Sequence, residues 1–110
     1  PILAVCYGQQ LFADIYGFKI SKKKHHVNTI HKLDITAISK KKDFLKVNSF
    51  HKYAVYKLPN FFNKLVRNKD GSIELAISKN NKILCTMFHP ERKNISQKKI
   101  NKIIFKHLNI

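Results

Sequence analysis

The chain opens with two hydrophobic patterns that meet at a cysteine. Residues 1–5 (PILAV) are all apolar, which is typical of a strand buried on both faces of a parallel sheet. From Gln9 to Tyr16 the apolar residues recur at helical spacing, and Gly17 is a residue type that often follows the end of a helix. The opening therefore predicts a strand, a sharp turn and a helix, with Cys6 at the turn.

Residues 18–56 have the pattern of short strands separated by lysine-rich turns. The alternation of Leu33, Ile35 and Ala37 with polar residues predicts a half-buried strand. Val47–Val55 predicts a further extended stretch. This part of the chain is therefore expected to be mostly β-structure.

The second half of the chain predicts a hairpin, a buried strand and a helix. Asp70-Gly71 is a strong turn signal between Leu65–Val66 and Ser72–Ile77. Ile83–Phe88 is apolar and predicts another strand. Ser96 is a favourable first residue for a final helix, whose apolar face is formed by Ile100, Ile103, Ile104 and Leu108.

These elements predict an α/β fold, with a mostly parallel central sheet, flanking helices and an antiparallel hairpin region. At 110 residues, with no internal repeat and no linker rich in glycine or serine, the chain has room for one domain. A parallel strand at residues 1–5 needs neighbours on both edges, but most later strands read as hairpins. We therefore expect residues 1–110 to be the C-terminal portion of a larger α/β domain whose first strands are missing.

The positive charge does not indicate a nucleic-acid interface. The 22 Lys and Arg residues outweigh the 6 Asp and Glu residues and give a net charge of +16, but lysines occur in almost every segment. Only two basic residues are arginines, the side chain preferred for base edges and bidentate phosphate contacts. Lys, Asn and Ile share A/T-rich codons, so genome composition explains their joint excess. We expect a solvated lysine-rich surface and no nucleic-acid partner.

The remaining composition predicts a cytoplasmic protein. No apolar run approaches the length of a membrane span, and the chain has no basic-then-apolar leader. Cys6 and Cys85 are too few for a disulfide framework, so a reducing compartment is expected. His25, His26 and His31 are interpreted as surface or strand histidines. No metal or organic cofactor is therefore expected.

Cys6 is the first candidate for chemistry. A thiol at a strand-to-helix turn lies near backbone N–H groups and the positive end of the helix dipole, which stabilise a thiolate. The small residues Ala4 and Gly8 suit a tight nucleophile elbow, and the N–H of Tyr7 would donate to an oxyanion. A buried structural cysteine is the alternative interpretation.

Two further segments could complete a site. His89-Pro90-Glu91 places a base and a carboxylate at the end of an apolar strand, as a cysteine nucleophile requires, although His-Pro is also an ordinary strand terminator. Val47–His51 is a polar cluster at a strand end that could hold a substrate, although an ordinary loop histidine is the simpler interpretation.

Together these segments resemble the class I glutamine amidotransferases and the related γ-glutamyl hydrolases. Ala4–Gln10 matches the family's G-x-C-x-G-x-Q elbow except for alanine at the first glycine, and Phe88–Glu91 matches its aromatic-H-P-E signature. Val47–His51 and Asp70–Glu74 resemble segments of the hydrolase branch in the expected order. Lys52 and Tyr53 depart from the His and Gln that often follow His51 in that branch.

The resemblance implies a flavodoxin-like fold and cysteine-dependent hydrolysis of a γ-glutamyl amide. Cys6, His89 and Glu91 would be the catalytic residues, and Tyr7 would line the oxyanion hole. Gln10 and the segment formed by Ser49, Phe50 and His51 would contact the glutamyl moiety.

The subgroup implied is the γ-glutamyl-CDP-amidate hydrolases of bacterial surface-sugar pathways, because Val47–His51 and Thr86–Arg92 look most like theirs. The alternatives are a glutaminase subunit that delivers ammonia to a synthase partner, or a truncated, inactive remnant of such an enzyme. The expected partners are a small-molecule γ-glutamyl amide, and a synthase subunit or a second copy.

Overall fold

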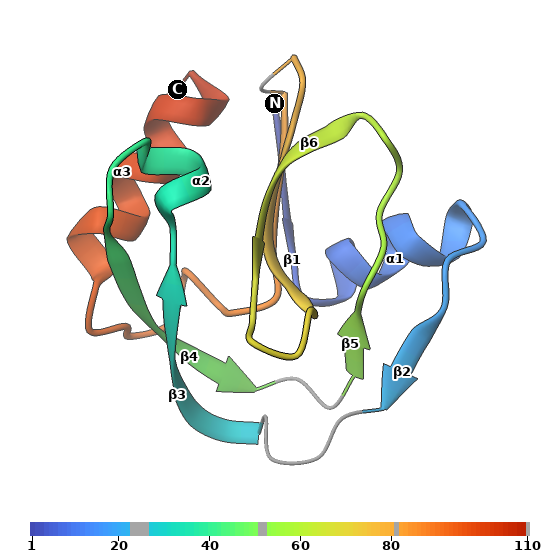
Figure 1. Cartoon of the computed structure of the whole chain (residues 1–110), viewed down its shortest axis with the longest axis horizontal. Helices are drawn as coiled ribbons and strands as arrows, with labels where there is room; N and C mark the ends of the chain where they lie inside the picture. Colours follow the sequence, from blue (N-terminus) through green and yellow to red (C-terminus); the bar gives the residue numbers. More distant parts are fainter. Residues whose placement is uncertain (23–26, 51–52, 81, 110) are drawn as a thin grey trace.

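The structure, a computed structural model, describes residues 1–22, 27–50, 53–80 and 82–109 (Figure 1). The strands are β1 (Ile2–Val5), β2 (Ile20–Lys22), β3 (Val27–Asp34), β4 (Phe44–Phe50), β5 (Tyr53–Val55), β6 (Phe62–Arg67), β7 (Ile73–Ser78) and β8 (Ile83–Thr86). The helices are α1 (Tyr7–Ile15), α2 (Thr36–Ser39) and α3 (Gln97–Leu108).

A four-stranded sheet in the order β1-β8-β7-β6 forms the centre of the fold. β1 runs parallel to β8, whereas β7 is antiparallel to both β8 and β6. The hairpin predicted at Asp70-Gly71 is confirmed, and Gly71 has φ 90°, a conformation that favours glycine. The α/β class is confirmed. The central sheet, predicted to be mostly parallel, is mixed within the described residues: β1–β8 is a parallel pair, and β8–β7 and β7–β6 are antiparallel.

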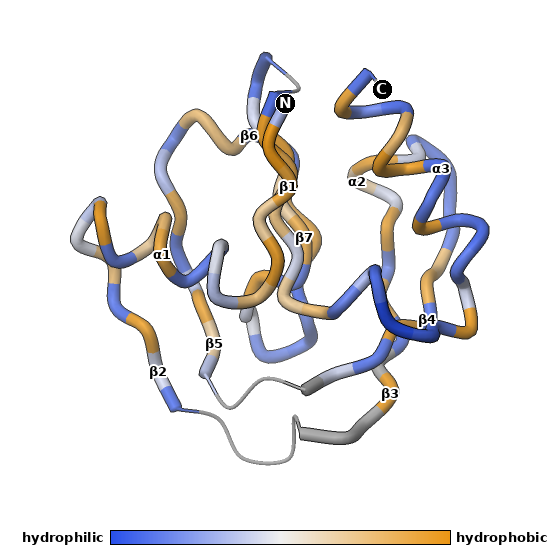
Figure 2. The backbone as a smooth tube through the Cα atoms, turned by 180° about the vertical axis from the view of Figure 1, so that it is seen from behind, coloured by the Kyte–Doolittle hydropathy of each residue, from blue (hydrophilic) through white to orange (hydrophobic). Residues whose placement is uncertain are grey.

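The helices lie on opposite faces of this sheet (Figure 1). α1 packs on one face, where Ala13 meets the buried residues Ala4, Ala76 and Cys85. On the other face, α3 and the β3–β4 ribbon enclose the larger apolar core. Figure 2 shows hydrophobic residues along the central strands and a strongly hydrophilic loop between β8 and α3.

The strand predicted from the alternation of Leu33, Ile35 and Ala37 ends early. β3 stops at Asp34, and Thr36 begins the short helix α2. The carboxylate of Asp34 accepts a hydrogen bond from the Thr36 backbone N–H at 2.9 Å, a local turn that competes with strand pairing. The prediction was therefore wrong beyond Asp34.

The extended stretch predicted over Val47–Val55 is two strands in different sheets. β4 pairs with β3, whereas β5 pairs with β2. Both pairings are antiparallel. Residues 51 and 52 lie outside the described residues.

The final helix is confirmed, but Ser96, the residue before it, has a different role from the one predicted. Ile100, Ile104 and Leu108 are buried in the core on one face of α3. Ser96 is at the N-cap position, but its side chain does not cap the helix. Its Oγ instead accepts a hydrogen bond from the Lys46 N–H at 2.9 Å, which ties β4 to the start of α3.

β1 is more exposed than a strand covered on both faces. Within the described residues it pairs with β8 alone, and 52% of Ile2 and 41% of Leu3 are exposed. On the adjoining helix, Leu11 and Ile15 are also exposed. Residues 1–18 contain no lysine or arginine, although the chain carries 22 of them. The open edge of β1 and the outer side of α1 therefore form an apolar surface without basic residues.

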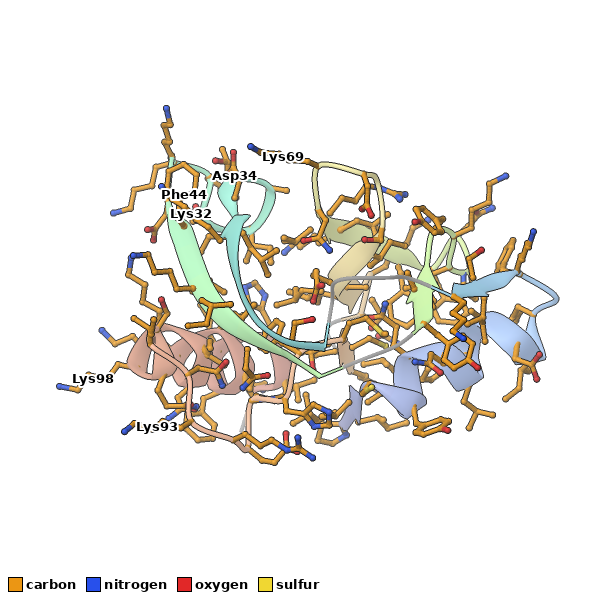
Figure 3. All side chains as sticks on the ribbon, turned by 90° about the horizontal axis from the view of Figure 1, so that it is seen from below. Lys32, Asp34, Phe44, Lys69, Lys93 and Lys98 are labelled. Atoms are coloured by element: carbon orange, nitrogen blue, oxygen red, sulfur yellow. The ribbon has the colours of Figure 1, made fainter. Side chains whose placement is uncertain are left out.

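The lysines extend into solvent from separate elements. In Figure 3, Lys69, Lys93 and Lys98 point outward from different parts of the fold. Lys32 lies on β3 with its Nζ 4.5 Å from the centre of the Phe44 ring. This distribution agrees with a solvated basic surface. None of the helices within the described ranges has the length and apolarity required to cross a membrane.

Candidate functional site

Cys6 occupies a strained backbone position between β1 and α1. It has φ 52° and ψ −94°, which a residue with a Cβ rarely adopts and which costs about 1–3 kcal/mol. Its N–H donates to the Thr86 carbonyl at 2.6 Å, and its carbonyl accepts from the Gln10 N–H at 3.1 Å. These bonds fix Cys6 between the end of the parallel pair and the first turn of α1, as a nucleophile elbow requires.

The elbow depends on a close contact between two small residues. A Cβ built on Gly8 would lie 2.8 Å from the Cβ of Ala4, well inside the normal contact distance. Because both atoms belong to short, rigid positions, neither can move away without shifting the backbone of β1 or α1. The predicted need for small residues on both sides of Cys6 agrees with this geometry.

Gly8→Ala is expected to lower the free energy of unfolding by up to about 2 kcal/mol. Overpacking costs about 1–3 kcal/mol, and the better helix propensity of alanine offsets about 1 kcal/mol of that loss. Urea unfolding of Gly8→Ala, Ala4→Gly and the double variant measures the coupling, which should be about 1–2 kcal/mol. Additive effects, within about 0.5 kcal/mol, would show that the two residues do not restrict each other.

The thiol of Cys6 is not held as a thiolate. Burial raises the pKa of the Cys6 thiol; a hydrogen bond with the Tyr7 backbone opposes this effect, and the negative charge of Glu74 adds to it. The expectation that the turn stabilises a thiolate is therefore wrong for this structure, because desolvation outweighs the backbone donor. Cys85 is fully buried, and burial raises its pKa to about 12.

Alkylation of Cys6 by iodoacetamide is expected to be slow at pH 7. Only the thiolate reacts, and an ordinary thiol titrates near about 8.5, so a raised pKa moves the rise in rate to more alkaline pH. Cys85 should react more slowly still. Mass spectrometry of the two cysteine peptides at a series of pH values measures both rates. Rapid labelling of Cys6 below about pH 7 would contradict this prediction.

His89 and Glu91 form a hydrogen-bonded pair in the loop after β8. Nδ1 of His89 lies 2.8 Å from Oε2 of Glu91. Partial burial alone would raise the pKa of the Glu91 carboxyl, but the hydrogen bond from His89 lowers it below its ordinary value. Glu91 is thus a carboxylate at neutral pH, and it favours the tautomer of His89 with the proton on Nδ1.

The parallel pairing brings the two halves of the site to one edge of the sheet. Val5 is paired with Thr86, so Cys6 and the loop that carries His89 leave the sheet at the same end. The charges of Glu91 and Arg92 both act on the Cys6 thiol. The fold thus places the Cys6 thiol and the hydrogen-bonded pair of His89 and Glu91 at the same edge of the sheet.

The other predicted site residues lie on α1 and β4. The Tyr7 side chain is 81% exposed, and its backbone forms the hydrogen bond with Cys6 noted above. Gln10 is buried in the first turns of α1, and Ser49 is buried in β4. Phe50 is the last residue of β4, and His51 lies outside the described residues.

Three polar residues near the candidate site had no clear signal in the sequence. Asn48 belongs to the polar cluster predicted to hold substrate, but its side chain is directed at the backbone of His89. Asn94 follows the His89-Pro90-Glu91 segment, and its side chain donates to the carbonyls of His89 and Arg92. Glu74 is almost fully buried, with Oε1 accepting a hydrogen bond from Asn68 Nδ2 at 2.9 Å. The contact between Asn48 and His89 joins residues 41 positions apart, so spacing alone could not reveal it.

The described part of the chain contains no group of three or more His, Cys, Asp or Glu side chains that could hold a metal ion. The neighbouring histidines His25 and His26 lie outside the described residues.

Comparison with known proteins identifies the family. The family described as glutamine amidotransferase class-I matches residues 1–109. A γ-glutamyl-CDP-amidate hydrolase of Campylobacter jejuni is 33% identical over 94 residues, which are 86% of this chain and 44% of that protein. A glutamine-hydrolyzing GMP synthase subunit of Methanosphaera stadtmanae is 29% identical in an alignment of 97 positions that covers 83% of this chain and 51% of that protein.

The fold agrees with a solved relative. The structure of a candidate GMP synthase subunit from Thermoplasma acidophilum superimposes with a TM-score of 0.77 at 22% identity, over 99% of this chain and 57% of that protein. The chain thus spans about half the length of the relatives it matches. Because the family match extends over nearly every residue, the chain belongs to the class I glutamine amidotransferase family.

Proposed function

We propose that this chain carries the catalytic machinery for cysteine-dependent hydrolysis of a γ-glutamyl amide. The observation that supports this most is the strained Cys6 at the end of β1, beside the parallel strand whose following loop pairs His89 with Glu91. The family assignment supports the same chemistry.

In the proposed reaction, Sγ of Cys6 attacks the γ-carbonyl carbon while His89 takes the thiol proton on Nε2. A thiol in the resting site requires this transfer to accompany the attack. The Tyr7 N–H donates to the developing oxyanion, and Glu91 holds the proton on Nδ1 of His89. His89 then protonates the leaving nitrogen, which leaves a glutamyl thioester on Cys6. His89 then deprotonates a water molecule that attacks the thioester carbonyl; the C–S bond breaks, glutamate leaves, and His89 returns the proton to Sγ of Cys6.

Gln10, Ser49, Phe50 and His51 are proposed to contact the glutamyl moiety. The burial of Gln10 and Ser49 supports a role at the floor of the site rather than at its rim. The proposed substrate is a γ-glutamyl nucleotide amidate of surface-sugar biosynthesis, supported by the similarity to the Campylobacter hydrolase. Such a substrate carries phosphate, and the positive charge of Arg92 beside the site would attract it.

A glutaminase subunit is the second candidate, favoured by relatives that are a carbamoyl phosphate synthase small chain and a GMP synthase subunit. In that case free glutamine is the substrate, and the partner that receives ammonia is a synthase. A higher kcat/KM for glutamine than for a γ-glutamyl phosphoramidate nucleotide would favour this candidate.

We also propose that residues 1–110 correspond to the C-terminal portion of a single domain. The coverage of about half of each relative supports this proposal. The apolar surface at the open edge of β1 supports it too, as does a groove of about 390 Å³ beside β1, lined by Leu3, Val5, Pro90, Glu91, Asn101, Ile104 and Phe105.

The test is glutamate release and thioester trapping with the purified chain. The chain is incubated with glutamine or with the nucleotide substrate, quenched in acid and analysed by intact-mass spectrometry, with Cys6→Ala as the control. A glutamyl adduct on Cys6 together with glutamate in solution is the expected result. A folded chain that gives neither product would support the inactive remnant.

A further inference from the structure

The loop that carries His89 is held by a buried side chain from a distant strand. Asn48 of β4 accepts a hydrogen bond from the His89 N–H through Oδ1 at 2.9 Å, and its Nδ2 donates to the His89 carbonyl at 3.0 Å. One amide group thus satisfies both backbone groups of the residue. Asn48 is 8% exposed, so water competes little for these bonds.

A second asparagine closes the arrangement from the other side of the loop. Nδ2 of Asn94 donates to the carbonyl of His89 at 3.0 Å and to that of Arg92 at 2.8 Å. Its Oδ1 accepts from the Asn48 N–H at 2.8 Å, so the two asparagines are bonded to each other as well. Asn94 is also 8% exposed. We call these two residues the asparagine clamp.

The clamp restricts the backbone of His89, whereas the Glu91 carboxylate holds its imidazole ring. Glu91 fixes the ring through Nδ1, but the direction in which Nε2 points also depends on the backbone of His89. Pro90 limits the backbone of His89 to extended conformations, and the clamp fixes both its N–H and its carbonyl. A displacement of about 1 Å at such a residue lowers rates by up to about 100-fold.

Ser96 also holds β4 against the segment between β8 and α3, but it does not contact His89. Ser96 joins the same two segments, because its Oγ accepts from the Lys46 N–H at 2.9 Å and its N–H donates to the Lys46 carbonyl at 3.3 Å. Ser96 makes these contacts to β4 and not to the His89 backbone. The two kinds of contact can therefore be separated by substitution.

We propose that Asn48 and Asn94 are positioning residues that fix the backbone of His89 so that its imidazole faces Cys6. The inference rests on the proposed function only in assigning His89 as the base. It gives the β3–β4 ribbon a role in the reaction, through a contact between residues 41 positions apart in sequence.

Asn48→Asp is the sharpest test, because it keeps the size of the side chain and the acceptor for the His89 N–H. The substitution replaces the donor with a carboxylate oxygen that faces the His89 carbonyl. We expect kcat to fall about 10- to 100-fold with KM changed by less than about threefold. Asn94→Asp, nearer the exposed end of the loop, should have the same effect and serves if Asn48→Asp does not fold.

A second readout follows His89 independently of turnover. In wild-type protein the ¹⁵N chemical shifts of the imidazole should report one tautomer, protonated on Nδ1. In both variants the displaced backbone should weaken the hydrogen bond between Nδ1 and Glu91, so the shifts should report a mixture. Ser96→Ala is the matched control, expected to lower the unfolding midpoint in urea without changing kcat or the ¹⁵N shifts.

The outcomes separate the two proposals. If wild-type protein releases no glutamate but the Asn48→Asp variant shows the mixed tautomers, the clamp stands and the proposed function fails. If wild-type protein is active and both Asp variants keep wild-type kcat and imidazole shifts, the clamp is overturned. Equal effects of Ser96→Ala on kcat and on the shifts would also overturn it.

Discussion

Cys6→Ala is expected to abolish glutamate release, with kcat lowered by about 10⁴-fold or more. The substitution removes the atom that forms the thioester, and no other described thiol can replace it, because Cys85 is fully buried in the strand next to β1. Loss of a triad nucleophile leaves only the rate enhancement from binding and from oxyanion stabilisation. Steady-state kinetics with a coupled glutamate assay measures the loss.

Cys85→Ala is the control for this experiment. Its thiol is buried against Ala4 and Ala76, so its removal leaves a small cavity and lowers stability by about 1 kcal/mol. The folded fraction should keep wild-type kcat. Substantial activity in Cys6→Ala would show that Cys6 is not the nucleophile. Loss of activity in folded Cys85→Ala would show that the reaction depends on Cys85.

Glu91→Gln is expected to lower kcat by about 10²- to 10⁴-fold while the chain stays folded. The side chain is 58% exposed, so the change costs little packing, but it removes the negative charge that holds the proton on Nδ1 of His89. With the proton on Nε2, the ring cannot accept the thiol proton of Cys6. Kinetics and circular dichroism of the same sample test both parts of this expectation.

Asp14→Asn provides the comparison for the loss of one carboxylate. Asp14 is exposed near the far end of α1 from Cys6 and lies outside the proposed machinery. Its kcat should equal that of wild-type protein. A Glu91→Gln variant with kcat within about threefold of wild type would show that the hydrogen bond between His89 and Glu91 does not orient the base.

The sequence was most informative where a local pattern determined the structure. The apolar run before Cys6, the helical spacing after it and the Asp70-Gly71 turn each depend on neighbouring residues, and all three elements are present. The position of Cys6 followed from the same local patterns. His89 and Glu91 were also found in this way, because a base and its carboxylate two residues apart form a local motif.

The errors arose where a side-chain contact or burial outweighs the pattern of apolar and polar residues. Leu33, Ile35 and Ala37 alternate with polar residues as in a strand, but the Asp34 carboxylate bonds to the Thr36 N–H and ends the strand. The alternation of apolar and polar residues cannot show this contact. Likewise, the turn at Cys6 suggested a stabilised thiolate, whereas burial dominates the pKa of Cys6. The role of Asn48 depends on a contact with His89 that only the folded chain creates.

The uneven distribution of charge has a consequence for colloidal behaviour. At low ionic strength a net charge of +16 keeps copies of the chain apart in every orientation. At about 0.1 M salt the screening length is about 10 Å, so this long-range repulsion fades while hydrophobic attraction remains. The apolar surface over residues 1–18, which has no basic residue, can then associate with the same surface of another copy. Added salt should therefore lower the solubility of this chain. Because copies associate through one surface, small oligomers should form before a precipitate does.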